Sequence, residues 1–244
     1  MAHAKTSGFK ELVKTVVYAV LIALAVRTFA YEPFSIPSGS MIPTLLVGDY
    51  LFVSKFSYGY SRYSLPLNLP LIPGRIFVTE PERGDVVVFK LPTDNKTDYI
   101  KRIVGLPGDR IQVVEGILHI NGEPVEREFV GDYAVPDSYG NVRRYNRYIE
   151  TLPNGRQHYI IEISDHEGAD NTDVYNVPEG HYFAMGDNRD SSRDSRFLRD
   201  VGYIPLNNLV GRAEFIFFSV DGDAWKVWDW YRTLRFDRFL QGIQ

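Results

Sequence analysis

The sequence predicts a mainly β protein, with a single N-terminal transmembrane helix followed by a β-rich domain that carries an inserted β cap. Three observations predict this class. An apolar run lies close to the N-terminus, helical periodicity is weak after residue 32, and short segments rich in valine, isoleucine and phenylalanine alternate with glycine and proline. Residues 32–244 are enough for one well-buried domain, with two small domains as the alternative.

The bulk composition excludes several classes of function. The chain has no cysteine, so a disulfide framework and a cysteine protease are both excluded. The five histidines are spread along the chain without metal-ligand spacing, and we expect no metal and no other cofactor. A formal net charge of -4 gives no reason to expect a nucleic acid as partner.

Residues 12–31 form the expected transmembrane anchor. As a helix they would reach about 30 Å, which matches the hydrocarbon thickness of a bilayer. The bases that precede the apolar core outnumber the single Arg27 that follows it; they are Lys5, Lys10 and Lys14. By the positive-inside rule, residues 1–11 are expected in the cytoplasm and residues 32–244 outside it.

A cleavable signal peptide is the main alternative for this segment. A basic start, an apolar stretch and the small residue that ends "TFA" (28–30) fit that interpretation loosely. Arg27 argues against it, because a cleavage region is usually uncharged. A buried core helix is disfavoured by the lysine-rich flank.

Short β-prone segments follow the anchor. Val53, "DVVVF" (85–89) and "NLVGRAEFIFFSV" (208–220) are expected in strands. The segment "RIQVVEGILHINGEPV" (110–125) predicts a hairpin followed by a second turn. The two expected turns are Glu115-Gly116 and Asn121-Gly122.

Three further stretches depart from this strand pattern. Residues 60–84 are rich in proline, and residues 131–180 are polar and rich in tyrosine. The second of these stretches is the expected β cap. Residues 224–244 mix tryptophan with arginine, which suits either an interfacial amphipathic segment or aromatic side chains that cover the core.

Three segments carry candidate chemistry: "PSGSMIPT" (37–44), "DYIKRIVGLPGD" (98–109) and "GDNRDSSRDSR" (186–196). Lys101 lies in an apolar, β-prone setting, and burial lowers the pKa of a lysine because it disfavours the charged form. A neutral lysine could accept the proton of a serine hydroxyl in the first segment, which would give a Ser-Lys dyad.

Each of these segments also has a purely structural interpretation. Lys101 could point to solvent from a strand edge, and Ser38 and Ser40 could be ordinary turn residues. The acidic segment 186–196 could be an ion-paired turn, and it lacks the closing glutamate of an EF-hand calcium loop. A Ser-His-Asp triad with His181 and Asp187 is the rival catalytic arrangement, but no GxSxG elbow supports it.

Taken together and in this order, the segments resemble those of bacterial type I signal peptidase, the leader peptidase family of membrane-bound serine proteases. The resemblance extends from the anchor to Gly211-Arg212. It rests on four segments: "PSGSMIPTLLVGD" (37–49), "RGDVVVFK" (83–90), "YIKRIVGLPGD" (99–109) and "GDNRDSSRDSR" (186–196).

The resemblance implies a role for each matching residue. Ser40 would be the nucleophile and Lys101 the general base. Ser38 would complete an oxyanion hole with the Ser40 amide, and Ser192 would orient the lysine. The residues implied to brace the site are Asp194 and Arg196, with Asp187 and Arg189 in the same turn. The residues implied to line shallow pockets for small substrate side chains are Phe34, Ile36, Pro37, Met41, Leu45, Tyr99 and Ile100.

The implied activity is that of a signal peptidase I, a serine endopeptidase that removes N-terminal signal peptides from exported preproteins after small residues at -1 and -3. Preproteins and membrane lipid would be its partners. The protein would cross the inner (plasma) membrane once, with its catalytic domain on the outer, periplasmic face. It departs from some members in having one N-terminal span and no cysteine pair in residues 131–180. The alternatives are another Ser-Lys protease, such as a self-cleaving repressor-type peptidase, and an anchored β domain that binds partners without catalysis.

Overall fold

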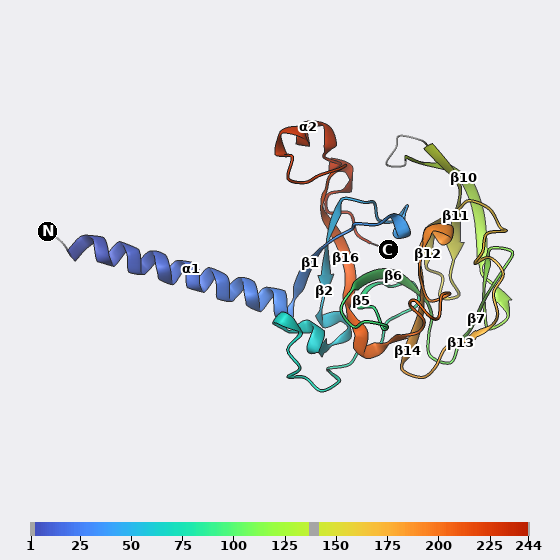
Figure 1. The fold of residues 1–244 in the computed structure, drawn as a ribbon, viewed down its shortest axis with the longest axis horizontal. Coiled ribbons are helices and arrows are strands. Elements are labelled where there is room, and N and C mark those ends of the chain that lie inside the picture. Colours follow the sequence, from blue (N-terminus) through green and yellow to red (C-terminus); the bar gives the residue numbers. More distant parts are fainter. Residues whose placement is uncertain (1–2, 137–141, 244) are drawn as a thin grey trace.

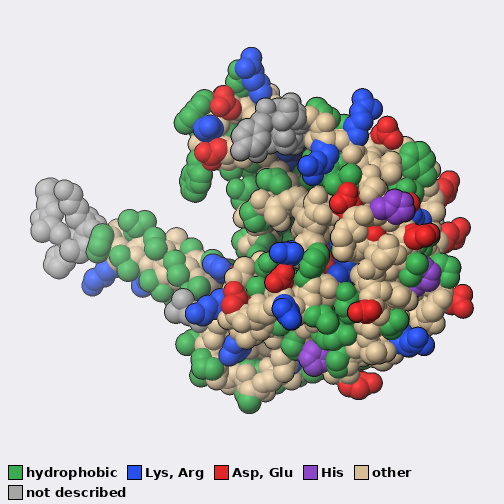
Figure 2. Space-filling view, turned by 45° about the vertical axis from the view of Figure 1, so that its right-hand side comes forward, with side chains coloured by type: hydrophobic (Ala, Val, Ile, Leu, Met, Phe, Trp, Pro, Cys, Tyr) green, Lys and Arg blue, Asp and Glu red, His purple; other side chains and the backbone are tan. Residues whose placement is uncertain are grey.

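The computed structural model describes residues 3–136 and 142–243. A long helix, α1 (His3–Phe29), projects from a β domain that contains the rest of the chain (Figure 1). Its stretch Gly8–Phe29 is long and apolar enough to cross a membrane. Figure 2 shows hydrophobic side chains along the part of this helix that lies outside the domain. The helix ends two residues before the expected end of the anchor, because the chain turns at Ala30 and begins strand β1 at Tyr31.

The main sheet of the described chain is antiparallel and has seven strands, in the order β1-β2-β16-β5-β6-β14-β15. Their bounds are β1 (Tyr31–Ser35), β2 (Asp49–Ser54), β5 (Val86–Lys90), β6 (Asp98–Gly105), β14 (His181–Met185), β15 (Ile204–Pro205) and β16 (Leu209–Ser219). Strands β2, β5 and β16 confirm the three strand predictions made from β-branched and aromatic composition. The sheet therefore brings together strands from both ends of the chain, and the mainly β fold class is confirmed.

A second sheet contains the predicted hairpin. It has the order β13-β7-β8-β9, and its strands are β7 (Arg110–Val114), β8 (Ile117–Ile120), β9 (Glu123–Pro124) and β13 (Tyr175–Asn176). The turn between β7 and β8 has φ of 49° at Glu115 and 74° at Gly116, and the next has 58° at Asn121 and 92° at Gly122. Two consecutive positive φ values define the tight turn that matches the twist of a hairpin, so both predicted turns are confirmed.

Strands β10 (Glu126–Pro136), β11 (Val142–Thr151) and β12 (Gln157–Glu162) form a third sheet. This sheet overlaps the region expected to form the cap, residues 131–180, of which residues 137–141 lie outside the described residues. It starts earlier, because β10 continues directly from the second sheet. The later part of the region contributes β13, which pairs with β7 instead.

The remaining elements are short. The proline-rich region holds the small sheet β3 (Tyr60–Ser61) with β4 (Arg75–Ile76), and the C-terminal region holds α2 (Trp230–Thr233). The 3-10 turns are Gly39–Met41, Phe56–Tyr58, Arg62–Ser64, Pro66–Asn68, Arg189–Ser191, Leu206–Asn208, Val227–Asp229 and Phe236–Arg238.

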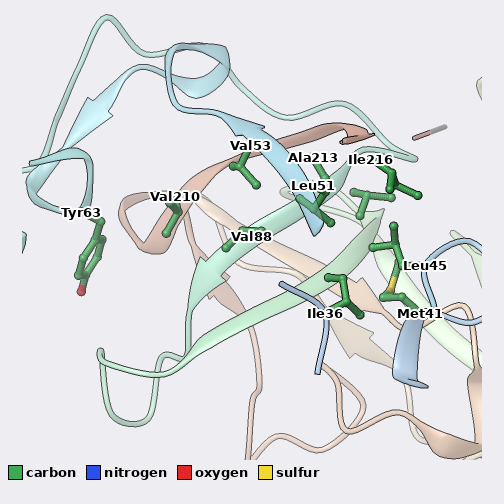
Figure 3. Close-up of a cluster of buried hydrophobic side chains, with 11 residues drawn as sticks. Ile36, Met41, Leu45, Leu51, Val53, Tyr63, Val88, Val210, Ala213 and Ile216 are labelled. Carbon is green, nitrogen blue, oxygen red and sulfur yellow. The ribbon is translucent and has the colours of Figure 1, made fainter. Parts of the chain in front are cut away.

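A cluster of buried side chains explains why the glycine- and proline-rich segment after β1 is ordered (Figure 3). Ile36, Met41 and Leu45 are at most 3% exposed and belong to one cluster with Leu51 of β2 and Ile216 of β16. Complete burial of such a side chain contributes about 1.5–3 kcal/mol. The segment that precedes and follows Ser40 is therefore held against the sheet by its apolar members.

Candidate active site

Ser40 lies in the 3-10 turn Gly39–Met41 and is buried. The loop that follows β14 holds this turn by two hydrogen bonds. The backbone N–H of Asn188 donates to the Ser40 carbonyl at 3.1 Å, and the Asn188 side-chain amide donates to the Gly39 carbonyl at 3.1 Å. Gly186 leaves room for this approach, because a Cβ at that position would lie 2.4 Å from the Ser40 carbonyl oxygen.

Lys101 reaches Ser40 from β6. Its Nζ lies 2.7 Å from the Ser40 Oγ and donates a second hydrogen bond to the Ile100 carbonyl at 2.8 Å. The side chain belongs to a residue that is 3% exposed, and this burial lowers the pKa of Lys101 to about 8, although the charges of Asp194 and Asp187 act in the opposite direction. The lysine is therefore buried and does not point to solvent, as the structural interpretation required.

Asp194 and Arg196 form a buried ion pair behind the site. The Arg196 Nε donates to Asp194 Oδ1 at 2.9 Å, and the Gly186 backbone N–H donates to Asp194 Oδ2 at 3.0 Å. Burial alone would raise the pKa of Asp194, but the Arg196 guanidinium outweighs it and lowers that pKa. The pair thus stays charged and fixes the course of the loop that contacts Ser40.

Asp187 pairs with Arg102, the residue after the buried lysine. Two parallel hydrogen bonds join them, at 2.9 Å from Nε and 2.8 Å from Nη2, and Thr44 Oγ1 donates to the same carboxylate at 2.5 Å. This buried carboxylate connects three segments that are distant in the sequence: the one around Ser40, β6 and the loop after β14. Sequence reasoning missed Arg102 and Thr44, although both lie inside the recognised segments.

Arg189 faces the third sheet. Its guanidinium forms two hydrogen bonds with Glu150 of β11, at 2.8 and 2.6 Å, so its partner lies outside its own turn. His158 of β12 lies beside this pair, with Nε2 3.3 Å from Glu150 Oε2 and 4.0 Å from Asp187 Oδ1. Burial lowers the pKa of His158, which favours the neutral ring. Neither Glu150 nor His158 belongs to a motif, so no sequence signal could have found them.

A cleft of about 380 Å³ opens beside Ser40 and Lys101. Of the residues that the resemblance implies for a substrate pocket, five line this cleft: Phe34, Ile36, Pro37, Tyr99 and Ile100. Met41 and Leu45 do not line it. Both are fully buried, in the same cluster as Ile36. A run of apolar residues in the sequence does not reveal which of its members face a surface. The lining residues that sequence reasoning missed are Ser35, Val88, Asp98, Ser191 and Arg193.

The two remaining serines differ in their surroundings. Ser38 is exposed and lines the cleft, where its hydroxyl can face a bound molecule. Ser192 is buried, and its hydroxyl lies close enough to Asp194 to contribute to the lowered pKa of that carboxyl. The Ser192 Oγ packs closely against Gly186, because a Cβ added at Gly186 would lie only 2.3 Å from it. The hydrogen bond from Ser192 to Lys101 that the resemblance implies stays a prediction.

The rival triad is not assembled. His181 lies at the start of β14 and its Nδ1 is 2.9 Å from the Glu179 carbonyl, while the Asp187 carboxylate is engaged with Arg102. Within residues 3–136 and 142–243, no group of three or more His, Cys, Asp or Glu side chains is arranged to hold a metal ion. The reactive geometry in this cleft is thus a serine hydroxyl against a buried amine.

Comparison with known proteins agrees with this geometry. Residues 9–218 match the family described as "Signal peptidase, peptidase S26". The chain is 42% identical to signal peptidase I of Rickettsia canadensis, over 94% of this chain and 92% of that protein. It is also 42% identical to signal peptidase I of Rickettsia typhi, over 93% of this chain and 90% of that protein.

A crystal structure of a signal peptidase I from Enterococcus faecalis V583 is also similar. It shares 25% identity and a TM-score of 0.31, with 55% of this chain and 97% of that chain covered. The matches to the family and to the two Rickettsia proteins span most of this chain, and they span most of each of those two relatives. The chain therefore belongs to the S26 signal peptidase family and is a serine peptidase.

Proposed function

We propose that this protein is a membrane-anchored endopeptidase that cleaves N-terminal signal peptides from exported preproteins, with Ser40 as nucleophile and Lys101 as general base. Membership of the signal peptidase family supports the substrate class. The single observation that carries the mechanism is the 2.7 Å separation between Lys101 Nζ and Ser40 Oγ in a buried setting. That distance is within hydrogen-bonding reach, as direct proton transfer requires.

The lowered pKa makes Lys101 usable as a base. With a pKa of about 8, roughly a tenth of the molecules hold a neutral lysine at pH 7. An unperturbed lysine would be neutral in only about 0.03% of molecules at the same pH, so burial raises the reactive fraction by more than a hundredfold. Asp194 and Asp187 then stabilise the positive charge that Lys101 acquires when it takes the Ser40 proton.

The reaction takes two steps. Ser40 Oγ attacks the carbonyl carbon of the scissile bond while its proton moves to Lys101, and the Ser38 hydroxyl and Ser40 N–H stabilise the oxyanion. Protonated Lys101 gives its proton to the departing amine, which leaves an acyl-enzyme. Lys101, neutral again, accepts a proton from water, whose oxygen attacks the ester. Protonated Lys101 returns this proton to Ser40 Oγ as the ester bond breaks, which releases the signal peptide with a free carboxyl group and restores the enzyme.

Unpaired strand edges support binding of an extended substrate. β1 is the edge strand of the main sheet, and β14 pairs with β6 only from Arg102 onward among the described residues. The edge of Asp98–Lys101 therefore faces the cleft, with β1 residues on the opposite wall. A peptide that pairs with these edges would place alternate side chains, those at -1 and -3, on the same side.

Packing beneath the cleft supports the preference for small residues at these two positions. Phe34, Ile36 and Ile100 provide an apolar wall. The fully buried Met41 and Leu45 pack in the same cluster as Ile36, so a large side chain could press into this wall only by displacing core residues. Small side chains fit without displacing the core, whereas forcing larger ones into a packed interior is costly.

The anchor supports a membrane location for this cleft. α1 ends at Phe29 and the turn that contains Ser40 begins at Gly39, so the reactive groups follow closely after the apolar helix. We place residues 1–11 in the cytoplasm and residues 32–244 outside the inner (plasma) membrane, on its periplasmic face, from the distribution of basic residues. Preproteins and membrane lipid are the proposed partners.

Cleavage of a preprotein in lipid vesicles tests this function. Wild type and the control variant Lys96→Ala, which changes an exposed lysine near β6, should both release the mature protein. Ser40→Ala and Lys101→Ala should lower the rate by at least about a thousandfold, because each removes a reacting group. If either variant retains the wild-type rate, the assignment of Ser40 and Lys101 is wrong. If wild type cuts no preprotein, the proposed function fails as a whole.

A further inference from the structure

A second cavity continues the active-site cleft toward the membrane helix. This groove has a volume of about 660 Å³ and runs between the C-terminal end of α1 and the 3-10 turns that follow β3. Phe34 and Asp98 line both the groove and the cleft beside Ser40, so the two cavities are adjacent and share a wall. In Figure 1 the segment that follows β2 lies beside the end of α1, on the side of the domain from which the helix projects.

One face of α1 forms a wall of the groove. Leu24, Arg27 and Thr28 line it, and their spacing of three and four residues places them on the same side of the helix. The position of the helix end is fixed, because the Tyr60 hydroxyl donates to the Phe29 carbonyl at 2.8 Å and Glu32 pairs with Arg27 at 2.7 Å. Farther along the helix, the same face continues with exposed apolar side chains, which are Val17, Val20 and Leu21.

The lining of the groove changes along its length. Leu24 and Leu65 make its helix end apolar, whereas the middle carries the buried ion pair between Lys55 and Glu32 at 2.8 Å. Lys90 pairs with Asp98 at 2.7 Å near the cleft. The groove thus holds three cations and two carboxylates, because Glu32 is the partner of both Arg27 and Lys55. Each cation is already engaged with a carboxylate, which suits a peptide segment without charged side chains better than an anionic headgroup.

We propose that this groove holds the stretch of the signal peptide between its apolar segment and the -3 residue, with the Leu24 face of α1 in contact with the substrate. The proposal rests on the proposed function. A signal peptide's apolar segment precedes its cleavage site, so residues upstream of -3 must lead from the cleft back toward the bilayer. The groove lies along that path, and its lining changes from apolar at the helix end to polar near the cleft, which suits a peptide that becomes polar after its apolar segment.

Paired tryptophan substitutions test this proposal. Leu24→Trp fills the groove from the helix side, whereas Ile22→Trp places the same bulk about 200° around the helix, away from the groove. We expect Leu24→Trp to lower kcat/KM for a full-length preprotein about tenfold, through KM. Its kcat/KM for a soluble peptide that begins at -3 should equal that of wild type, and Ile22→Trp should match wild type on both substrates.

Photocrosslinking in the Ser40→Ala background identifies the occupant. A photoreactive residue at position 24 should crosslink to preprotein residues upstream of -3, and the same probe at position 22 should not. Wild-type kinetics of Leu24→Trp on both substrates, or crosslinks from position 24 to lipid alone, would overturn the groove proposal while the proposed function stands. If wild type cleaves neither the preprotein nor the soluble peptide, the proposed function itself is overturned.

Discussion

At the scale of single residues, burial of Lys101 destabilises its charged amine and so lowers its pKa. A shift of its pKa from 10.5 to about 8 corresponds to about 3 kcal/mol of destabilisation of the charged form. Carbonyl and hydroxyl acceptors around Nζ, together with the nearby carboxylates, keep that cost tolerable. If Lys101 is the base, as proposed, this loss of stability is what leaves it partly neutral at physiological pH.

Replacing this lysine should stabilise the protein. Lys101→Met removes a buried charge and keeps a similar volume, so we expect the free energy of unfolding at pH 7 to rise by about 1–3 kcal/mol while activity is lost. The folded-state pKa lies below the unfolded value, so the penalty of the wild type is fully present below pH 8 and disappears as pH rises toward 10.5. Denaturant unfolding at pH 7 and at pH 9.5 should show a smaller difference at the higher pH. Equal stability of the two proteins at pH 7 would contradict this reasoning.

The same pKa sets the pH dependence of catalysis. Because the neutral amine is the active form in the proposed mechanism, kcat/KM should rise about tenfold per pH unit below a pKa of about 8 and then level off. Tyr99 lies close by, with its ring centre 5.5 Å from Lys101 Nζ. Tyr99→Ala should admit water and move the acid limb to higher pH, whereas Tyr99→Phe should leave it in place. A limb that does not move in Tyr99→Ala would argue against Lys101 as its origin.

Sequence patterns located most reactive residues but could not assign their surroundings. The position of Ser40 and Lys101 in two short segments was enough to pair them, because the resemblance supplied the roles. Whether an apolar residue faces the cleft or the core depends on the fold of a turn without periodicity, so the sequence could not show that Met41 and Leu45 lie in the core. Glu150 was missed because its partner Arg189 lies far away in the sequence.

At the scale of elements, the third sheet is tied to the active site by buried charges. β11 supplies Glu150 to Arg189, and the backbone N–H of Ile161 in β12 donates to the Asp187 carbonyl at 2.9 Å. Burial opposes ionisation of Glu150, but the Arg189 guanidinium holds its pKa well below the usual range. The sheet therefore acts as a support for the loop that fixes Ser40.

Neutralising this support should be costly. Glu150→Gln leaves the Arg189 charge buried without its carboxylate, so we expect a loss of about 3 kcal/mol in stability and a lower kcat with little change in KM. Glu128→Gln, on an exposed position of β10, is the matched control and should behave as wild type. The Glu150 contribution is present above the unfolded pKa of a glutamate and should be lost as pH falls below about 4. A Glu150→Gln protein with wild-type unfolding and kinetics would show that the sheet does not support the loop.

Local signals predicted elements where the backbone itself is constrained. Asn121-Gly122 adopts the positive φ values that such a pair favours, and the valine-rich strands are where composition placed them. The bounds of the third sheet were not predictable, because β10 continues without a break from the second sheet and its tyrosine-rich pattern has no sharp start. Long-range pairing, as between β2 and β16, leaves no local trace in the sequence.

At the scale of the whole molecule, the hydrophobic core of the β domain is formed without side chains from α1. Among the described residues, no buried member of the hydrophobic clusters precedes Ile36. α1 touches the domain at its last turn, through Phe29 and Arg27, and leaves its apolar side chains exposed to whatever surrounds it. Folding and anchoring are thus separable properties of the chain.

Removal of α1 should therefore leave a folded peptidase with altered substrate preference. Residues 30–244 alone should unfold cooperatively and cleave a soluble peptide that begins at -3 with kcat/KM within about threefold of wild type, because the cleft is built from residues after Phe29. Cleavage of a preprotein in vesicles should fall by at least about a hundredfold, since the effective concentration supplied by the membrane is lost. Two chimaeras distinguish the effect of losing the membrane anchor from the effect of losing the α1 residues that line the groove. An unrelated apolar helix in place of residues 8–23 keeps Leu24, Arg27 and Thr28 and should restore preprotein cleavage, whereas one that replaces residues 8–28 should restore it only in part. If the truncated domain is unfolded, α1 contributes to the core; if both chimaeras perform equally, the helix serves the enzyme as an anchor and nothing more.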